Sequence, residues 1–126
     1  MSDKDIYSAV GKIMWSLMPK RAVKFELFGK FYDDFSEDEA WLIDASGGRF
    51  QFDFDNYPTM PLHEIMENMR RLRTMEPFKR EPWTHFKAIL NEEGKFKVEF
   101  AYVPREQDVI GVYMRGGTAQ ELADQQ

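Results

Sequence analysis

The sequence contains no cysteine, only two histidines and no long apolar run. Without cysteine the chain forms no disulfide, no thiolate nucleophile and no thiolate metal site. Its longest apolar stretches are far shorter than the ~20 residues that span a bilayer. The first five residues are polar and acidic, which is unlike the basic and then apolar start of a signal peptide. We therefore expect a cytoplasmic protein without membrane contact.

Motifs for catalysis are also missing. The chain has no Gly-x-Ser-x-Gly nucleophile turn and no glycine loop of the phosphate-binding type. His63 and Glu67 are four residues apart on a predicted helix, where a zinc protease would carry a second histidine in place of the glutamate. We interpret this pair as ordinary helix surface, and we expect His85 in a strand beside Lys97 or Glu99. The sequence predicts no enzyme, no catalytic residue, no metal and no cofactor.

What the chain does have is apolar and aromatic content. Of its 126 residues, 43% are apolar and 15% aromatic, which is enough to build one packed core. We predict one domain over residues 1–115 and a frayed tail over residues 116–126. For residues 108–114 the pattern favours neither a helix nor a strand.

The periodicity of apolar residues predicts seven elements. Helical spacing over residues 3–18 and in a second segment that begins near Thr59 indicates two amphipathic helices. We expect Ser2 to cap the first helix and Thr59 to cap the second. Period-2 alternation indicates strands, which we place at residues 23–32, 40–43, 50–55, 81–90 and 95–102.

The last two strands form the strongest local signal, because a polar four-residue loop separates them. Gly94 closes that loop, where it can adopt a positive φ without a steric penalty. The element order α-β-β-β-α-β-β predicts an α+β fold, with an antiparallel sheet of about five strands and both helices packed on one face. The opposite sheet face is expected to meet water or a partner.

The hairpin also carries a resemblance to a known family. A basic helix end is followed by Glu81-Pro82-Trp83, an alternating strand, the turn Gly94-Lys95-Phe96 and a strand that ends at Tyr102. This arrangement over residues 70–102 resembles the YezG-like immunity proteins. The resemblance implies a small cytoplasmic antitoxin that neutralises a cognate secreted toxin, often a nuclease. After Pro104 the chain differs from the longer helical C-terminal segment of that family.

Charge indicates which kind of partner to expect. The net charge is −5, yet the segment from Asp33 to Asp55 alone carries −7, so the rest of the chain is slightly basic. Such an acidic segment favours a basic protein partner and disfavours nucleic acid. We predict that toxin binding uses five acids of one run, two further acids on the 50–55 strand and three aromatic anchors. These are Asp33, Asp34, Glu37, Asp38 and Glu39; Asp53 and Asp55; and Tyr32, Phe35 and Trp41.

Two other functions stay open at this stage. The chain could be a generic interaction or homodimerisation module that uses the exposed sheet face or residues 108–114. It could also bind RNA through Arg70, Arg71 and Arg73 at the end of the second helix. The simpler interpretation of these arginines is that they complement the helix dipole and pair with nearby glutamates.

Overall fold

The computed structural model describes residues 2–108, and the predictions for residues 109–115 and for the tail 116–126 lie outside that range. The two helices are α1 (Asp3–Leu17) and α2 (Thr59–Arg73). The strands are β1 (Ala22–Phe31), β2 (Ser36–Asp44), β3 (Arg49–Phe50), β4 (His85–Asn91) and β5 (Phe96–Ala101). Two 3₁₀ turns, η1 (Phe54–Asn56) and η2 (Arg105–Gln107), complete the order.

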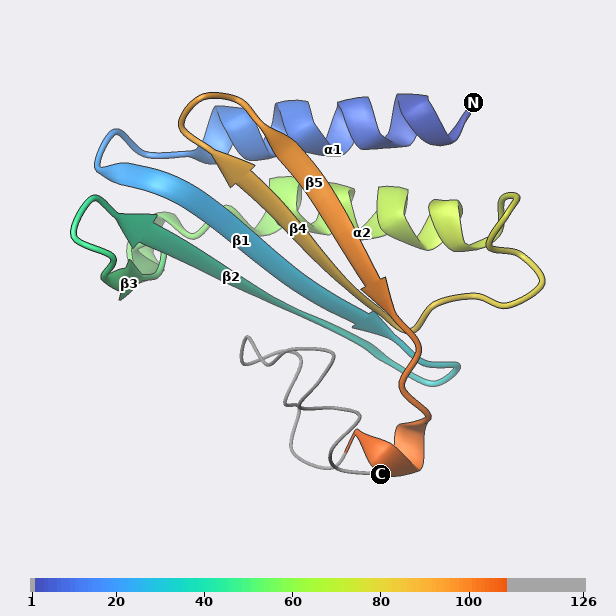
Figure 1. The fold of residues 1–126 in the computed structure, drawn as a ribbon. Helices are drawn as coiled ribbons and strands as arrows, with labels where there is room; N and C mark the ends of the chain where they lie inside the picture. The colour runs from blue at the N-terminus through green and yellow to red at the C-terminus, as the bar shows by residue number, and fades with distance from the viewer. Residues whose placement is uncertain (1, 109–126) are drawn as a thin grey trace.

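The five strands form one antiparallel sheet in the order β3-β2-β1-β4-β5. Both helices lie against the same face of this sheet, and they contact each other (Figure 1). The predicted α+β class, the element order and the five-strand antiparallel sheet are therefore confirmed.

The main core lies between the helices and the sheet, because alternate residues of each strand point toward the helices. In β1 these are Phe25, Leu27 and Phe31, which are fully buried. The same face includes Gly29, whose missing side chain leaves room for Phe86 of β4. A Cβ atom at position 29 would lie 2.1 Å from the Phe86 ring. The apolar stripes of α1 and α2 close the core from the other side.

The ends of the elements follow local chemistry. At α1 the Ser2 hydroxyl accepts from the backbone N–H of Asp5, and the Asp5 carboxylate accepts from the N–H of Ser2, which is the predicted capping box. In the β4–β5 turn Gly94 has φ 83°, as predicted. At α2, however, Pro58 occupies the N-cap position and Thr59 is already helical, so the predicted Thr59 cap is wrong.

Three strand predictions need correction. The strand predicted at residues 81–90 begins only at His85. Of the strand predicted at residues 50–55 only Phe50 lies in the sheet, because β3 consists of Arg49 and Phe50 and the chain then leaves it for η1. Phe50 and Phe52 still pack against the core, but Phe54 is 94% exposed. The second strand begins at Ser36 rather than residue 40, so part of the presumed acidic loop belongs to the sheet.

The sheet face opposite the helices is only partly open to water. The chain after β5 turns back across it, so Val103 packs on Phe28 together with Trp41 and Ala101. Both Phe28 and Val103 are buried. The prediction of a uniformly wet or partner-facing outer surface is therefore wrong near the end of β1. Tyr102, predicted in the apolar row of the last strand, lies past the end of β5 and is 69% exposed.

Candidate functional site

The turn between β1 and β2 holds several predicted contact residues. The backbone N–H of Tyr32 donates to the Phe35 carbonyl at 2.9 Å, and the two rings lie 5.5 Å apart. The Asp34 carboxylate is 2.6 Å from the Arg105 guanidinium, which also lies 5.0 Å from the centre of the Phe35 ring. Arg105 therefore partly compensates the charge that Asp34 would offer to a partner.

Strand β2 separates the next three acids by the alternation of its side chains. Glu37 pairs with Lys30 and Glu39 with Phe28, so both point to the sheet face away from the helices. Asp38 pairs with Gly29 and points to the helix side. The run from residue 33 to 39 therefore does not form one continuous acidic face, which corrects the expectation drawn from its spacing in the sequence.

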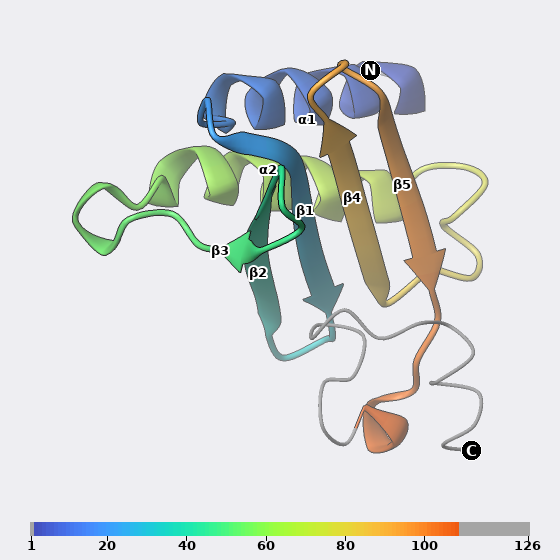
Figure 2. The same ribbon diagram turned by 60° about the vertical axis from the view of Figure 1, so that its left-hand side comes forward.

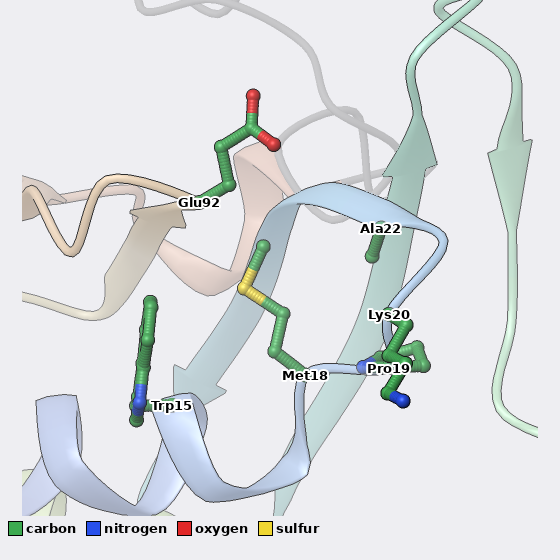
Figure 3. Close-up of a pocket in the computed structure, with 6 residues that line it drawn as sticks. All are labelled: Trp15, Met18, Pro19, Lys20, Ala22 and Glu92. Carbon is green, nitrogen blue, oxygen red and sulfur yellow. The ribbon is translucent and has the colours of Figure 1, made fainter.

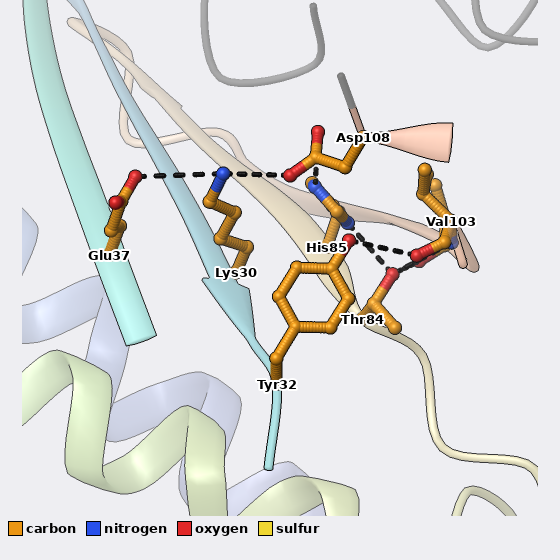
Figure 4. A network of polar contacts seen from close by, with 8 residues as sticks. Lys30, Tyr32, Glu37, Thr84, His85, Val103 and Asp108 are labelled. Atoms are coloured by element: carbon orange, nitrogen blue, oxygen red, sulfur yellow. Dashed lines mark hydrogen bonds and ion pairs between the residues drawn. The ribbon is translucent and has the colours of Figure 1, made fainter. Parts of the chain in front are cut away.

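Lys30 is the centre of a polar network beneath the chain that follows β5 (Figure 4). Its ammonium group lies 2.7 Å from the Asp108 carboxylate and 3.6 Å from Glu37. The side chains of Lys30 and Asp108 are both nearly buried. The other Asp108 oxygen is 3.5 Å from Nε2 of His85. Glu37 thus forms an ion pair with Lys30 within the protein, and this pairing reduces the availability of the Glu37 carboxylate to a partner.

The same network fixes His85 and Tyr32. The Thr84 hydroxyl lies 2.7 Å from Nδ1 of His85 and accepts from the Val103 N–H at 2.8 Å. The Tyr32 hydroxyl donates to the Val103 carbonyl at 2.9 Å. Burial lowers the pKa of His85, although Asp108 opposes that shift. The predicted neighbours of His85, Lys97 and Glu99, are wrong, because its cross-strand partners are Lys30 and Ala101.

Burial also raises the pKa of Tyr32, and the nearby Asp108 carboxylate adds to the shift. Sequence reasoning assigned Tyr32 to a partner surface, yet its hydroxyl holds the segment after β5 in place. The signal for this network was weak, because Lys30 and Asp108 are 78 residues apart and neither belongs to a motif.

Trp41 is likewise engaged within the protein. Its ring is half-buried against Phe28 and Val103, and the guanidinium of Arg49 lies 4.1 Å from its centre. To act as an anchor for a partner, Trp41 would have to give up its contacts with Phe28, Val103 and Arg49 for contacts with the partner.

A groove of about 280 Å³ lies on the helix side, between the start of β2 and α2. Asp38 lines it together with Tyr57, His63, Glu67 and Arg70. Loss of surrounding water raises the pKa of Asp38, and His63 opposes this shift. The pKa of Tyr57 is raised by burial and then by the charges of Asp38 and Glu39. Asp38 and Tyr57 line the same groove, so the Asp38 carboxylate lies close to the segment just before α2.

Asp53 and Asp55 lie in the segment that connects β3 to α2, here called the β3–α2 loop (residues 51–58). Because the third strand is short, they do not share a strand face as predicted; Asp53 precedes η1 and Asp55 lies within it. Both residues are exposed, and neither forms an ion pair within the part of the chain that the structure describes. Their negative charge is therefore available to a partner.

The basic end of α2 is used mainly by the protein itself. Arg73 donates from Nε to the Trp83 carbonyl at 2.8 Å, and it lies 5.5 Å from the centre of the Phe31 ring. Arg70 lies 5.0 Å from the same ring and 3.5 Å from Glu67. Burial lowers the pKa of Arg73, and the charge of Asp33 opposes this shift. Two of the three arginines predicted to bind RNA therefore contact groups of the protein itself.

Chemistry of a catalytic or metal site is not apparent in residues 2–108. No group of three or more histidine, aspartate and glutamate side chains there could hold a metal ion. One shallow depression of about 270 Å³ lies between the end of α1 and β4 (Figure 3). Its charged members, Lys20 and Glu92, lie apart from each other, with Met18 between them. Within the described range, no helix has the length and apolarity needed to cross a bilayer.

These features define a small α+β protein whose sheet carries helices on one face. The family model for immunity proteins of the YezG-like type matches residues 49–111, half of the chain. The chain therefore belongs to the YezG-like immunity protein family, as its hairpin indicated. The matched region begins at β3 and includes the β3–α2 loop, α2, β4, β5 and Asp108. No curated protein matches the chain.

Proposed function

We propose that this chain is a non-catalytic, cytoplasmic immunity protein that binds a basic toxin domain, with a nuclease as the expected class, and blocks its active surface. Membership in the YezG-like immunity family carries the proposal. The exposed carboxylates between residues 33 and 55 support the choice of a basic partner. A basic nuclease domain attracts the phosphate backbone of its substrate, and an array of carboxylates competes for the same groups.

Electrostatics would act mainly on the rate of association. Complementary charge raises association rates to on the order of 10⁸–10⁹ M⁻¹s⁻¹ at low salt, whereas apolar contacts slow dissociation. An inhibitor needs both, because the toxin must be captured before it reaches its substrate and then retained.

The proposed acidic contacts fall into two groups. Asp33, Asp34, Glu37 and Glu39 lie around the β1–β2 turn and the outer sheet face, where Arg105 and Lys30 partly compensate them. The second group comprises Asp38, Asp53 and Asp55, which lie around the β3–α2 loop. We expect the second group to contribute more to binding, because fewer internal cations compensate it.

A growth assay tests the function. Candidate toxins are the C-terminal domains of large secreted proteins encoded beside the gene for this chain. Each is expressed from an inducible promoter, with and without this chain. We expect one of them to stop growth alone and to be harmless when this chain is co-expressed. A set of toxic domains of which none is suppressed would contradict the proposed function.

A further inference from the structure

We propose that the β3–α2 loop and the first turn of α2 together form the main toxin-docking element. Exposed Phe54 of the loop and Met60 of the helix enter an apolar depression on a basic toxin surface, while Asp53 and Asp55 meet its cations. This inference rests on the proposed function and specifies which surface performs it. Sequence reasoning did not select these apolar residues, because alternation in a six-residue strand would have placed Phe54 in the core.

Three exposed apolar side chains lie within seven residues, in this loop and the first turn of α2. Phe54 is 94% exposed, Met60 73% and Tyr57 42%. Within the described range only Trp15 and Tyr102 are comparable large exposed apolar residues, and they lie in separate elements. The loop projects from the body of the protein beyond the edge of the sheet (Figure 2). Exposed apolar side chains this close together in the sequence reduce solubility unless a partner covers them, so they favour an interaction site here.

Aromatic contacts connect the loop to the core. The ring of Phe52 meets that of Phe25 edge to face at 5.4 Å, and Tyr57 meets Phe52 in the same way at 6.2 Å. The N–H of Thr59 donates to the Tyr57 carbonyl at 2.8 Å. Phe54 is therefore presented on an ordered support, and its burial against a partner would cost little further conformational entropy.

Charge specifies the chemistry of the partner. Residues 50–62 contain two aspartates and no lysine or arginine. Arg49, just before them, stacks on Trp41. Asp38 of β2 lines the same groove as Tyr57 at the end of the loop, so its negative charge lies close to the loop. Exposed apolar side chains surrounded by negative charge are complementary to a basic protein surface that contains an apolar depression. Aromatic side chains buried in such depressions typically contribute most of the binding free energy.

The test compares binding of the toxin that the growth assay identifies, purified in a catalytically inactive form. The variant Phe54→Ser/Met60→Ser should fold normally, because both side chains are mostly exposed. We expect its Kd for that toxin to rise at least about tenfold, mainly through faster dissociation. Tyr102→Ser, which removes a similarly exposed apolar side chain after β5, should change Kd less than about twofold.

A second variant tests the electrostatic part of the proposed docking contact. Asp53→Asn/Asp55→Asn should slow association at low salt severalfold and leave dissociation nearly unchanged. Unchanged affinity of Phe54→Ser/Met60→Ser for a toxin that the parent protein binds would overturn the docking inference and leave the immunity function intact. If the parent protein binds no toxin and suppresses none, both the docking inference and the proposed immunity function are wrong. If the loop variant alters only self-association, measured by sedimentation, a second copy of the chain is the occupant and the inference is wrong.

Discussion

At the scale of single residues, Gly29 is the clearest case of a position fixed by packing. Its neighbour across the sheet is Phe86, and a Cβ atom would lie 2.1 Å from that buried ring. We predict that Gly29→Ala lowers the free energy of unfolding by about 1–3 kcal/mol, because the ring must move within a filled core. Urea unfolding of the variant and the parent measures this difference.

Gly11 provides the matched control. A Cβ atom there would lie 3.6 Å from the Phe96 ring, which is ordinary contact, and the position is helical. Gly11→Ala should leave stability unchanged or raise it by up to about 1 kcal/mol. Equal destabilisation by the two substitutions would show that the contact with Phe86 does not set the cost.

The burial of His85 leads us to predict that the stability of the protein depends on pH. Its pKa lies below the ordinary 6.5 in the folded state because the ring is buried, with Lys30 and Asp108 as its charged neighbours. Between the lowered value and about 6.5 the unfolded chain binds more protons than the folded chain. The contribution of His85 to stability is therefore full above about 6.5 and is lost as the pH falls through that window.

The measurement is the free energy of unfolding between about pH 5 and 7.5. His85→Gln should flatten the part of the profile just below pH 6.5, whatever its effect on stability at pH 7.5. An unchanged slope in this variant would mean that His85 takes up its proton equally in both states.

At the scale of elements, the sequence predicted those whose signals are local. The α1 helix, its capping box and the β4–β5 hairpin were correct because capping residues, helical spacing and Gly94 act over a few positions. The third strand was wrong for a tertiary reason. Phe50 and Phe52 reach the core as alternation predicts, but after Phe50 the chain leaves the sheet, so Phe54 is exposed.

The capping box of α1 gives a prediction at this scale. Ser2→Ala removes the hydroxyl that accepts from the Asp5 N–H at 3.3 Å, and it should cost about 0.5–2 kcal/mol of stability. Ser16→Ala, near the other end of the helix, removes only a bond to the Ile13 carbonyl and should cost less. Thermal unfolding compares the two variants, and an equal loss would argue against a capping role for Ser2.

At the scale of the whole molecule, proximity in sequence was a poor guide to proximity in space. The acids from residue 33 to 39 alternate between two sheet faces once β2 begins at Ser36, and Asp34 pairs with Arg105 from the other end of the described chain. Composition predicted an excess of negative charge but not its compensation. Asp38, Asp53 and Asp55 were part of the predicted site, whereas Phe54 and Met60 could be recognised only from their exposure.

This distribution predicts how binding depends on salt. The association rate of the purified toxin domain should fall at least about tenfold between about 20 mM and 500 mM salt, because screening shortens the range of the attraction. Asp53→Lys/Asp55→Lys should reduce the low-salt rate more than Asp34→Lys/Glu37→Lys, whose acids are already paired within the protein. Stopped-flow mixing measures both rates, and the reverse ranking would place the contact at the β1–β2 turn.

The most direct test of neutralisation by binding is a titration of toxin activity. The active toxin domain is held at a concentration well above the Kd, and this chain is added in steps. Inhibition by occupancy predicts that activity falls in a straight line and reaches zero at one chain per toxin. Complete inhibition at a small fraction of that ratio would indicate catalytic inactivation, and undiminished activity at excess would contradict the account.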